Sequence, residues 1–175
     1  MKKNSLITNF ILLIGVLTIV YGFVCRLTDT YYFWESKYVG LTILMLGVIG
    51  IMIDRIKINK TLKKKSILQK ITIGIMIFII GSQISWISFI PFTESYKMTE
   101  KSILENNFLK QDIGEIKSIQ IIPSGNIKTE KDLNGEKTYA QFKLIIKGEN
   151  KYLDLKTSAL KTSENENWQV EINDY

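Results

Sequence analysis

The chain has 175 residues, and its 23 Lys and Arg residues against 17 Asp and Glu residues give a formal net charge of +6. This excess lies in residues 1–90, which carry 11 basic and 3 acidic side chains, whereas residues 91–175 carry 12 and 14. Nucleic-acid binders place Lys and Arg on a folded face, so basic residues among long apolar runs argue against a nucleic-acid partner. The chain has no histidine, which excludes a Ser-His or Cys-His nucleophile. Its single cysteine, Cys25, excludes an intramolecular disulfide.

Three long runs without charged residues predict three transmembrane helices, at about residues 5–24, 38–53 and 71–92. A helix needs about 20 apolar residues to cross a bilayer. The second run has only 16 residues, which leaves a buried helix of a soluble domain as the alternative for that segment. The first run is expected to be an uncleaved anchor, because residues 21–25 lack a small-x-small cleavage site. No charge lies inside any run, which argues against an ion pathway.

The charges between the runs predict the orientation in the membrane, because short cytoplasmic loops are enriched in Lys and Arg. Lys2 and Lys3 place the N-terminus in the cytoplasm. The segment 26–37 has two basic and two acidic residues and suits the outside, whereas the segment 54–70 has seven basic residues and one acid and suits the cytoplasm. Residues 94–175 are therefore expected outside. The basic segment can also contact anionic lipid headgroups of the bilayer.

Small residues within the runs predict close helix packing. Each run holds two glycines seven residues apart, close to two helical turns, so each pair shares one helix face. Small residues allow membrane helices to approach closely, and the pattern predicts a packed three-helix bundle. The glycines are Gly15, Gly22, Gly40, Gly47, Gly74 and Gly81. The aromatic residues at 31–34, Trp86 and Phe92 are expected at the membrane–water interfaces.

The residues after the third run predict a small α+β domain. Residues 95–113 are expected to form one helix, with Ile103, Leu104 and Phe108 at helical spacing and Gly114 as the stop. The remainder predicts an antiparallel meander of about four strands, whose apolar face the helix covers. The expected strands are residues 115–122, which end in a turn at 123–126, and residues 137–148, 151–157 and 168–172.

Alternation along the predicted strands assigns side chains to two faces of the sheet. Phe142 and Trp168 are expected in the core beneath the helix. Tyr139, Gln141 and Tyr152 are expected to point away from the helix. Because exposed tyrosines are favoured at interfaces, these three residues form the candidate partner-binding surface. They are equally consistent with ordinary strand residues, since aromatic side chains suit pleated surfaces.

The outer domain offers no recognisable chemistry for catalysis or metal binding. It has no cysteine, no histidine and one methionine, Met98, although copper, haem and zinc sites rely on these residue types. Its carboxylates are scattered among lysines, and no Gly-rich phosphate loop is present. We therefore expect no catalytic residue, no metal ligand and no cofactor, and a protein that is not an enzyme.

A series of structural motifs gives the outer domain a resemblance to a known family. Tyr96 and Met98 open the helix, Asn107 lies in ENNFLKQDIGEI, and Gly114 ends the helix. The hairpin YAQFKLIIKGENKYLDLKT turns at Gly148, and Trp168 closes the pattern in NWQVEI. Over residues 94–172 the chain resembles the cytochrome oxidase complex assembly protein 1 family. The resemblance does not include the first two spans, because the mitochondrial members have a single one.

The resemblance implies a non-enzymatic assembly or docking module with a membrane anchor and an extramembrane α+β domain. The mitochondrial members assist cytochrome oxidase assembly or dock membrane complexes of the import translocase. The resulting hypothesis is a multi-pass cell-membrane protein of bacterial type whose outer domain binds a membrane protein complex, with cytochrome oxidase as one candidate. The lack of His and Cys in the outer domain argues against metal delivery. The alternative is a membrane immunity or envelope-stress protein that binds a toxin or senses the envelope.

Overall fold

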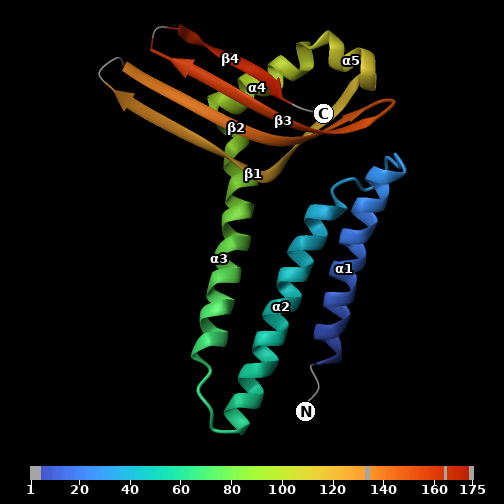
Figure 1. The fold of residues 1–175 in the computed structure, drawn as a ribbon, viewed down its shortest axis with the longest axis vertical. Helices are drawn as coiled ribbons and strands as arrows, with labels where there is room; N and C mark the ends of the chain where they lie inside the picture. The colour runs from blue at the N-terminus through green and yellow to red at the C-terminus, as the bar shows by residue number, and fades with distance from the viewer. Residues whose placement is uncertain (1–4, 133–134, 164, 174–175) are drawn as a thin grey trace. The chain divides into compact units, whose positions relative to one another are not determined.

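The computed structural model describes residues 5–132, 135–163 and 165–173. Three long helices, α1 (Leu6–Leu27), α2 (Ser36–Thr61) and α3 (Ile67–Phe89), are followed by a 3-10 turn, η1 (Ile90–Phe92), and by α4 (Glu94–Glu105) and α5 (Asn107–Ile113). Four strands follow: β1 (Ile116–Asp132), β2 (Gly135–Gly148), β3 (Tyr152–Thr162) and β4 (Asn165–Asn173) (Figure 1). The predicted fold class is confirmed, since three long apolar helices precede a helical segment and a four-stranded antiparallel meander.

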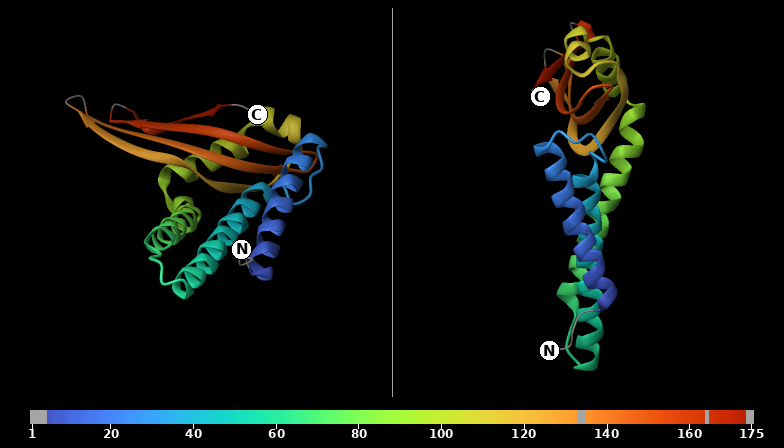
Figure 2. Two further views of the ribbon diagram at one scale, coloured as in Figure 1. Left: turned by 60° about the horizontal axis from the view of Figure 1, so that its bottom comes forward. Right: turned by 90° about the vertical axis from the view of Figure 1, so that its right-hand side faces the viewer.

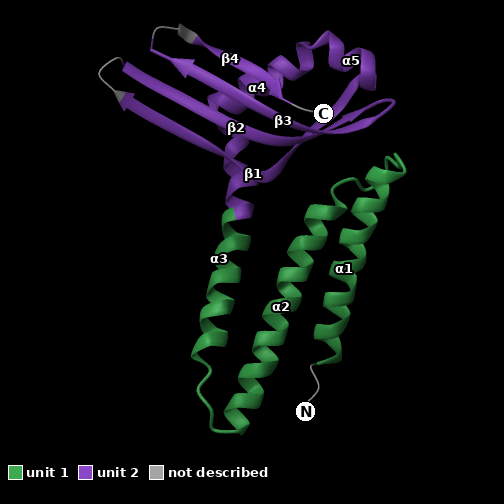
Figure 3. Ribbon diagram, viewed as in Figure 1, with its two compact units in different colours: residues 1–82 green, residues 83–175 purple. Residues whose placement is uncertain are grey.

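The chain forms two compact units, Met1–Ser82 and Gln83–Tyr175 (Figure 3). The division falls inside α3, ahead of residue 94, where the sequence analysis places the domain boundary. The end of α3 belongs to the second unit because Trp86 packs against that unit's hydrophobic core. A Cβ placed on Gly125 of β1 would lie only 2.9 Å from the Trp86 ring. Trp86, which the sequence analysis assigns to a membrane interface, is therefore part of the packing of the outer domain.

Each of the three long helices is a candidate membrane span by length and composition. Leu6–Leu27, Ser36–Thr61 and Ile67–Phe92 have 22, 26 and 26 residues and contain segments with mean hydropathies of 2.3, 2.0 and 2.0. At about 1.5 Å per residue, each can cross a hydrocarbon core of about 30 Å. The helix around residues 38–53 is longer than the run that predicts it, because Lys and Arg are good helix formers and continue it. These features define a multi-pass membrane protein.

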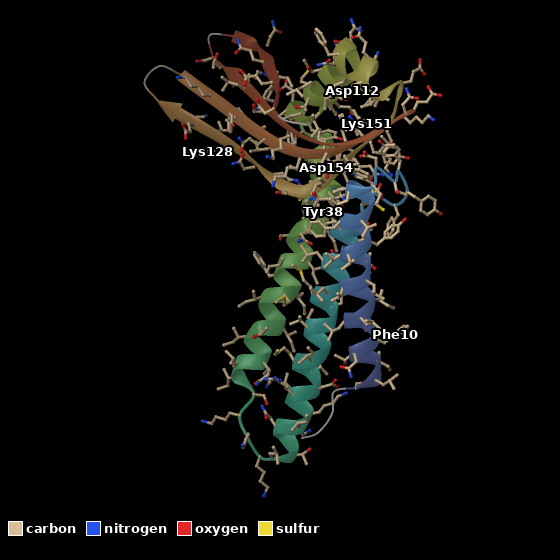
Figure 4. All side chains as sticks on the ribbon, turned by 45° about the vertical axis from the view of Figure 1, so that its right-hand side comes forward. Phe10, Tyr38, Asp112, Lys128, Lys151 and Asp154 are labelled. Atoms are coloured by element: carbon tan, nitrogen blue, oxygen red, sulfur yellow. The ribbon has the colours of Figure 1, made fainter. Side chains whose placement is uncertain are left out.

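The glycines of α1 and α2 bring the two helices into backbone contact, as their spacing predicts. A Cβ on Gly15 would lie 2.8 Å from the backbone nitrogen of Leu44, and a Cβ on Gly22 would lie 2.5 Å from that of Lys37. Gly40 is equally close to α1. Any larger side chain at these positions would force the helices apart. Elsewhere on these helices apolar side chains such as Phe10 are exposed and available to lipid (Figure 4).

The prediction of a three-helix bundle is wrong for α3. A Cβ on Gly74 or Gly81 would meet no heavy atom within 4 Å, and α3 contributes no buried residue among those described. The physical reason lies in the α1–α2 contact, where the glycines of the two helices face each other. No small-residue face of α1 or α2 is then left to receive α3, and its glycine face stays open.

Arg26 holds the connection between α1 and α2 in place through hydrogen bonds and a ring contact. Its guanidinium donates hydrogen bonds to the carbonyl oxygens of Gly22 at 2.9 Å and Trp34 at 3.0 Å, and it lies 4.8 Å from the centre of the Trp34 ring. A guanidinium over an indole is attracted to the negative ring face. Cys25 is buried and its thiol donates to the Tyr32 carbonyl at 3.4 Å. The aromatic run at 31–34 thus orders a short connection.

The outer unit is a meander in which each strand pairs with the next in antiparallel order. Figure 2 shows α4 and α5 against one face of this sheet. That face and the two helices enclose one hydrophobic core, as predicted, because strand side chains alternate between faces. The core contains Ile90, Tyr96, Ile103, Leu109, Ile113, Ala140, Phe142, Leu144, Ile146, Leu153, Leu155 and Ala159.

The single helix predicted for residues 95–113 is wrong, because the chain breaks at Asn106. This residue has extended backbone angles, φ −77° and ψ 107°, and its side-chain oxygen accepts a hydrogen bond from the Leu109 backbone N–H at 3.0 Å. Asparagine is a favoured N-cap, and here it starts α5. The break turns Leu109 and Ile113 into the core, whereas Phe108, which the helical spacing grouped with Ile103, is 79% exposed.

The turn predicted at residues 123–126 is also wrong, because β1 continues through it as a bulge. Ile121 pairs with Leu144 and Gly125 pairs with Phe142, so three residues of β1 lie opposite the single residue Lys143 of β2. Extra residues in one strand of a pair form a β-bulge, which bends the strand without ending it. Pairing resumes beyond the bulge as far as Asp132, so the Pro-Ser-Gly-Asn cluster disrupts the ladder locally and does not reverse the chain.

Candidate functional site

The residues that carry the family resemblance lie in the packing of the outer domain. Tyr96 is buried at the start of α4, and its ring meets that of Phe142 edge-on, with centroids 5.7 Å apart. Burial, and secondarily the negative charge of Glu100, raises the pKa of Tyr96 to about 12. The phenol therefore stays neutral at physiological pH and acts as a core aromatic.

Gly114 and Gly148 meet where α5 joins the β2–β3 hairpin. Gly114 has φ +79°, which favours glycine, and ends α5. A Cβ on Gly148 would lie 2.3 Å from the carbonyl oxygen of Ile113. That same oxygen accepts a hydrogen bond from the Asn150 backbone N–H at 2.9 Å. Both glycines therefore serve a close backbone contact between helix and hairpin.

Side chains reinforce this contact, and the motif asparagine does not take part. Lys151 and Asp112 form an ion pair at 3.4 Å, and both are labelled in Figure 4. Asn107, the motif residue chosen from the sequence, is the exposed first residue of α5, whereas its neighbour Asn106 supplies the cap. Gly114 and Gly148 of the motif thus hold α5 against the β2–β3 hairpin. The motif brings no reactive side chains together.

Trp168 lies beside a hollow of about 470 Å³ on the helix-covered face. It is half-buried, where the sequence analysis expects it fully beneath the helix, because β4 is an edge strand of the sheet. The Nζ of Lys161 forms an ion pair with Glu94 at 3.2 Å and lies 5.7 Å from the centre of the Trp168 ring. The three side chains therefore form a clasp between the start of α4 and the strands β3 and β4.

Within this clasp, the charge of Lys161 balances the charge of Glu94. The pKa of the Glu94 carboxyl is lowered, first by its hydrogen bond from Lys161 and second by the Trp168 indole N–H. That N–H faces the carboxylate but does not reach ordinary hydrogen-bond geometry. Because the acid and the base neutralise each other, the hollow offers no unpaired charge from these two residues to a ligand. The clasp of Glu94, Lys161 and Trp168 therefore holds the start of α4 on the sheet.

The other face of the sheet carries two of the three candidate partner-binding residues side by side. Tyr139 and Gln141 of β2 are exposed, and the Gln141 amide donates a hydrogen bond to the Tyr139 hydroxyl. Lys128 of β1, labelled in Figure 4, is the register partner of Tyr139. It forms an ion pair with Glu130. The exposed residues Tyr139 and Gln141 of β2 and Lys128 of β1 form what we term the uncovered face.

Tyr152 does not belong to this group. It pairs with Lys147, whereas Tyr139 pairs with Leu160 at the other end of β2. Eight residues of strand separate positions 139 and 147, about 27 Å at about 3.4 Å per residue. Tyr152 is half-buried, and Lys147 lies 5.5 Å from the centre of its ring. The structure therefore brings together Tyr139 and Gln141 but not Tyr152.

The uncovered face also holds two lysines that the sequence analysis did not select. Lys143 and Lys156 are register partners on β2 and β3, and both line a hollow of about 360 Å³ beside the β1 bulge. Alternation along the strand already places Lys143 on the same face as Gln141. The facing of the two lysines depends on hairpin register, which residue types alone do not specify.

Within residues 5–132, 135–163 and 165–173, no group of three or more Cys, Asp or Glu side chains could hold a metal ion. Comparison with protein-family models, with curated proteins and with solved structures finds no match. The fold and the surfaces described above therefore define the protein as a multi-pass membrane protein that carries a small α+β domain.

Proposed function

We propose that this protein is a non-enzymatic docking factor whose outer domain binds a membrane protein complex through the uncovered face. The observation that carries the proposal is the Tyr139–Gln141 pair, exposed on a sheet whose opposite face is occupied by α4 and α5. Tyrosine is favoured at protein interfaces because it offers apolar area and a hydroxyl at low entropic cost. The hydrogen bond between the two side chains holds them ready for a partner.

The proposal includes an orientation, with the N-terminus and residues 54–70 in the cytoplasm and residues 94–175 outside. The charge of the short segments supports this orientation. Residues 54–70 carry seven basic residues and one acid, whereas residues 26–37 carry two basic and two acidic residues. In this orientation the domain lies on the side where an envelope complex or a secreted protein can reach it. α3 begins at Ile67, within the basic segment.

The resemblance over residues 94–172 makes a cytochrome oxidase the first complex to test. The residues of that resemblance, Tyr96, Gly114, Gly148 and Trp168, serve packing, so they support a shared fold more than a shared partner. A test of the proposal must therefore use the uncovered face. A toxin captured there would instead favour the immunity function.

The experiment places a photo-crosslinking amino acid at position 139 or 141 of the full chain in its native membrane. A matched control carries it at Lys101 of α4, whose side chain is 64% exposed on the helix side of the domain. We expect one dominant membrane partner from 139 and 141 and none from 101. In parallel, a deletion strain should lose assembled oxidase, and Y139A/Q141A should fail to restore it where K101A succeeds.

Equal crosslinking from all three positions would contradict docking through this face. Normal oxidase levels in the deletion strain would remove the oxidase as the partner. A secreted protein as the dominant adduct would transfer the proposal to immunity.

A further inference from the structure

The bulge in β1 opens a hollow beside a single residue of β2. Residues 122–124 lie opposite Lys143, because the ladder passes from the Ile121–Leu144 pair directly to the Gly125–Phe142 pair. Gly125 re-enters the ladder so closely that an added Cβ would lie 2.2 Å from the Gln141 carbonyl oxygen. Bulges of this kind re-aim side chains and occur next to functional sites. Here the bulge leaves a space of about 360 Å³ at Lys143.

A second lysine stands directly across the strands from the first. Lys143 and Lys156 are partners in the β2–β3 register, and both are exposed. Like charges directly opposite each other in an antiparallel pair destabilise the sheet. Such a pair persists at a cost to the fold unless something else interacts with it.

Neither lysine forms an ion pair with another residue that the structure describes. Among the described residues, no ion pair within 4.0 Å involves Lys143 or Lys156. Among the described residues, the acids nearest to Lys156 by register on this face are Asp154, two residues along β3, and Glu171, which pairs with Ser158. Lys128, by contrast, pairs with Glu130 on the same face. Among the described residues, the two positive charges at the bulge therefore have no ion-pair partner within 4.0 Å.

The other walls of the hollow that the structure describes are neutral and able to form hydrogen bonds. Besides the two lysines they include Ser124, Asn126, Gln141 and Asn173. Asn173 is fixed by a hydrogen bond from its amide to the Ser158 hydroxyl at 2.8 Å. Hydroxyl and amide groups can donate to the oxygens of an anion without adding charge. We term these six residues the lysine hollow.

We propose that the lysine hollow binds a phosphate or phosphodiester group. The two ammonium groups supply up to six N–H donors for an anion with several oxygens, and charge-assisted hydrogen bonds are the strong ones. A tetrahedral anion can bridge two lysines that face each other and still reach the neutral walls. Bound there, it converts an unfavourable lysine pair into a favourable one and so couples ligand binding to the stability of the outer domain.

The group can come from the headgroup of an anionic lipid or from free phosphate, and the experiment separates the two. The full chain is placed in phosphatidylcholine nanodiscs, and its unfolding temperature is followed by tryptophan fluorescence. One arm titrates potassium phosphate against potassium chloride at matched ionic strength. The other arm replaces part of the phosphatidylcholine with phosphatidylglycerol. The hollow variant is K143Q/K156Q, and the control is K97Q/K110Q, which removes two exposed lysines from α4 and α5 with the same change of charge.

We expect a saturable rise in the unfolding temperature of the wild type in at least one arm. The rise should persist in K97Q/K110Q, and its half-saturation should move at least tenfold in K143Q/K156Q. A rise with phosphate assigns the ligand to the free anion, and a rise only with phosphatidylglycerol assigns it to the headgroup. In chloride and phosphatidylcholine, K143Q/K156Q should unfold at least as high as the wild type, because the repulsion is removed.

The proposal is overturned if neither arm moves the wild type, or if both double variants respond as it does. An unfolding temperature of K143Q/K156Q well below that of the wild type without anion would overturn it too, because the lysines would then be structural supports.

Discussion

Asp54 of α2 accepts a hydrogen bond from the hydroxyl of Thr8 of α1 at 2.9 Å. A second hydrogen bond, from the Ser5 backbone N–H at 2.8 Å, reaches the same carboxylate oxygen. Asp54 is the only acid in the segment 54–70, and the contact explains why it is there. A carboxylate at a helix N-terminus satisfies free N–H groups and interacts favourably with the helix dipole. Asp54 thus caps α1 from the neighbouring helix.

Replacing Asp54 with Ala should loosen the α1–α2 pair at this end. We expect a lower unfolding temperature for the full chain in nanodiscs, because Ser5 and Thr8 lose their shared acceptor. D54N should lose less, since its amide oxygen can still accept. The control is D29N, in the α1–α2 connection at φ 48°, a conformation that Asn tolerates. Equal effects of D54A and D29N would show that the cap contributes nothing.

The clasp at Trp168 predicts a dependence of stability on pH. The folded state holds the pKa of Glu94 below its ordinary value because Lys161 donates to the carboxylate. A depressed pKa adds stability above the ordinary pKa, and that stability is lost as pH falls through the folded value. We therefore expect the wild type to unfold at a higher temperature than E94Q near neutral pH, with the difference shrinking as the pH falls below the ordinary carboxyl pKa and disappearing below the folded value. A difference that is independent of pH would contradict the ion pair.

Residue types predicted the structure of a segment correctly where its apolar residues follow a single periodicity. The alternation around Phe142 placed that side chain in the core and Tyr139 and Gln141 outside, and the structure agrees. The break at Asn106 was not predictable in this way. Helical spacing grouped Phe108 with Ile103, whereas the break at Asn106 turns the neighbouring Leu109 into the core and leaves Phe108 exposed.

The candidate sites depend on pairings between distant residues, which a single sequence does not contain. Lys143 faces Lys156 only because the β2–β3 hairpin sets the register. The bulge opposite Lys143 looked like a turn, since Pro and Gly favour both. Gly74 has the same spacing to the next glycine as Gly15, yet only Gly15 meets another helix.

Orientation can be tested by cysteine labelling in a C25S background. Cys25 is buried against the Tyr32 carbonyl, which a serine hydroxyl can also reach as a donor. Single cysteines at Lys64 and Lys131, both exposed, should react with a membrane-impermeant maleimide from outside only at position 131. Labelling at position 64 in intact cells would invalidate the proposed topology.

Core substitutions should rank by burial. Phe142 is 1% exposed and meets the Tyr96 ring, so F142A should lower the free energy of unfolding by about 3–5 kcal/mol. Trp168 is half-buried at an edge strand, so W168A should cost less than F142A despite the larger side chain. Chemical denaturation of the full chain, monitored by circular dichroism, gives both values. A larger loss for W168A would mean that the clasp, and not the Phe142 layer, dominates the core.

The two classes of membrane glycine should respond differently to alanine. A Cβ at position 22 would lie 2.5 Å from the Lys37 backbone nitrogen, so G22A should separate α1 from α2 and cost about 1–3 kcal/mol, as overpacking does. G74A meets open space and should be neutral or stabilising by up to about 1 kcal/mol in the isolated protein, since Ala is the better helix former. Unfolding in nanodiscs measures both.

If G74A is harmless to the purified protein but lowers its function in cells, the open face of α3 contacts a partner helix. If G22A unfolds like the wild type, the close α1–α2 contact does not hold the two helices together.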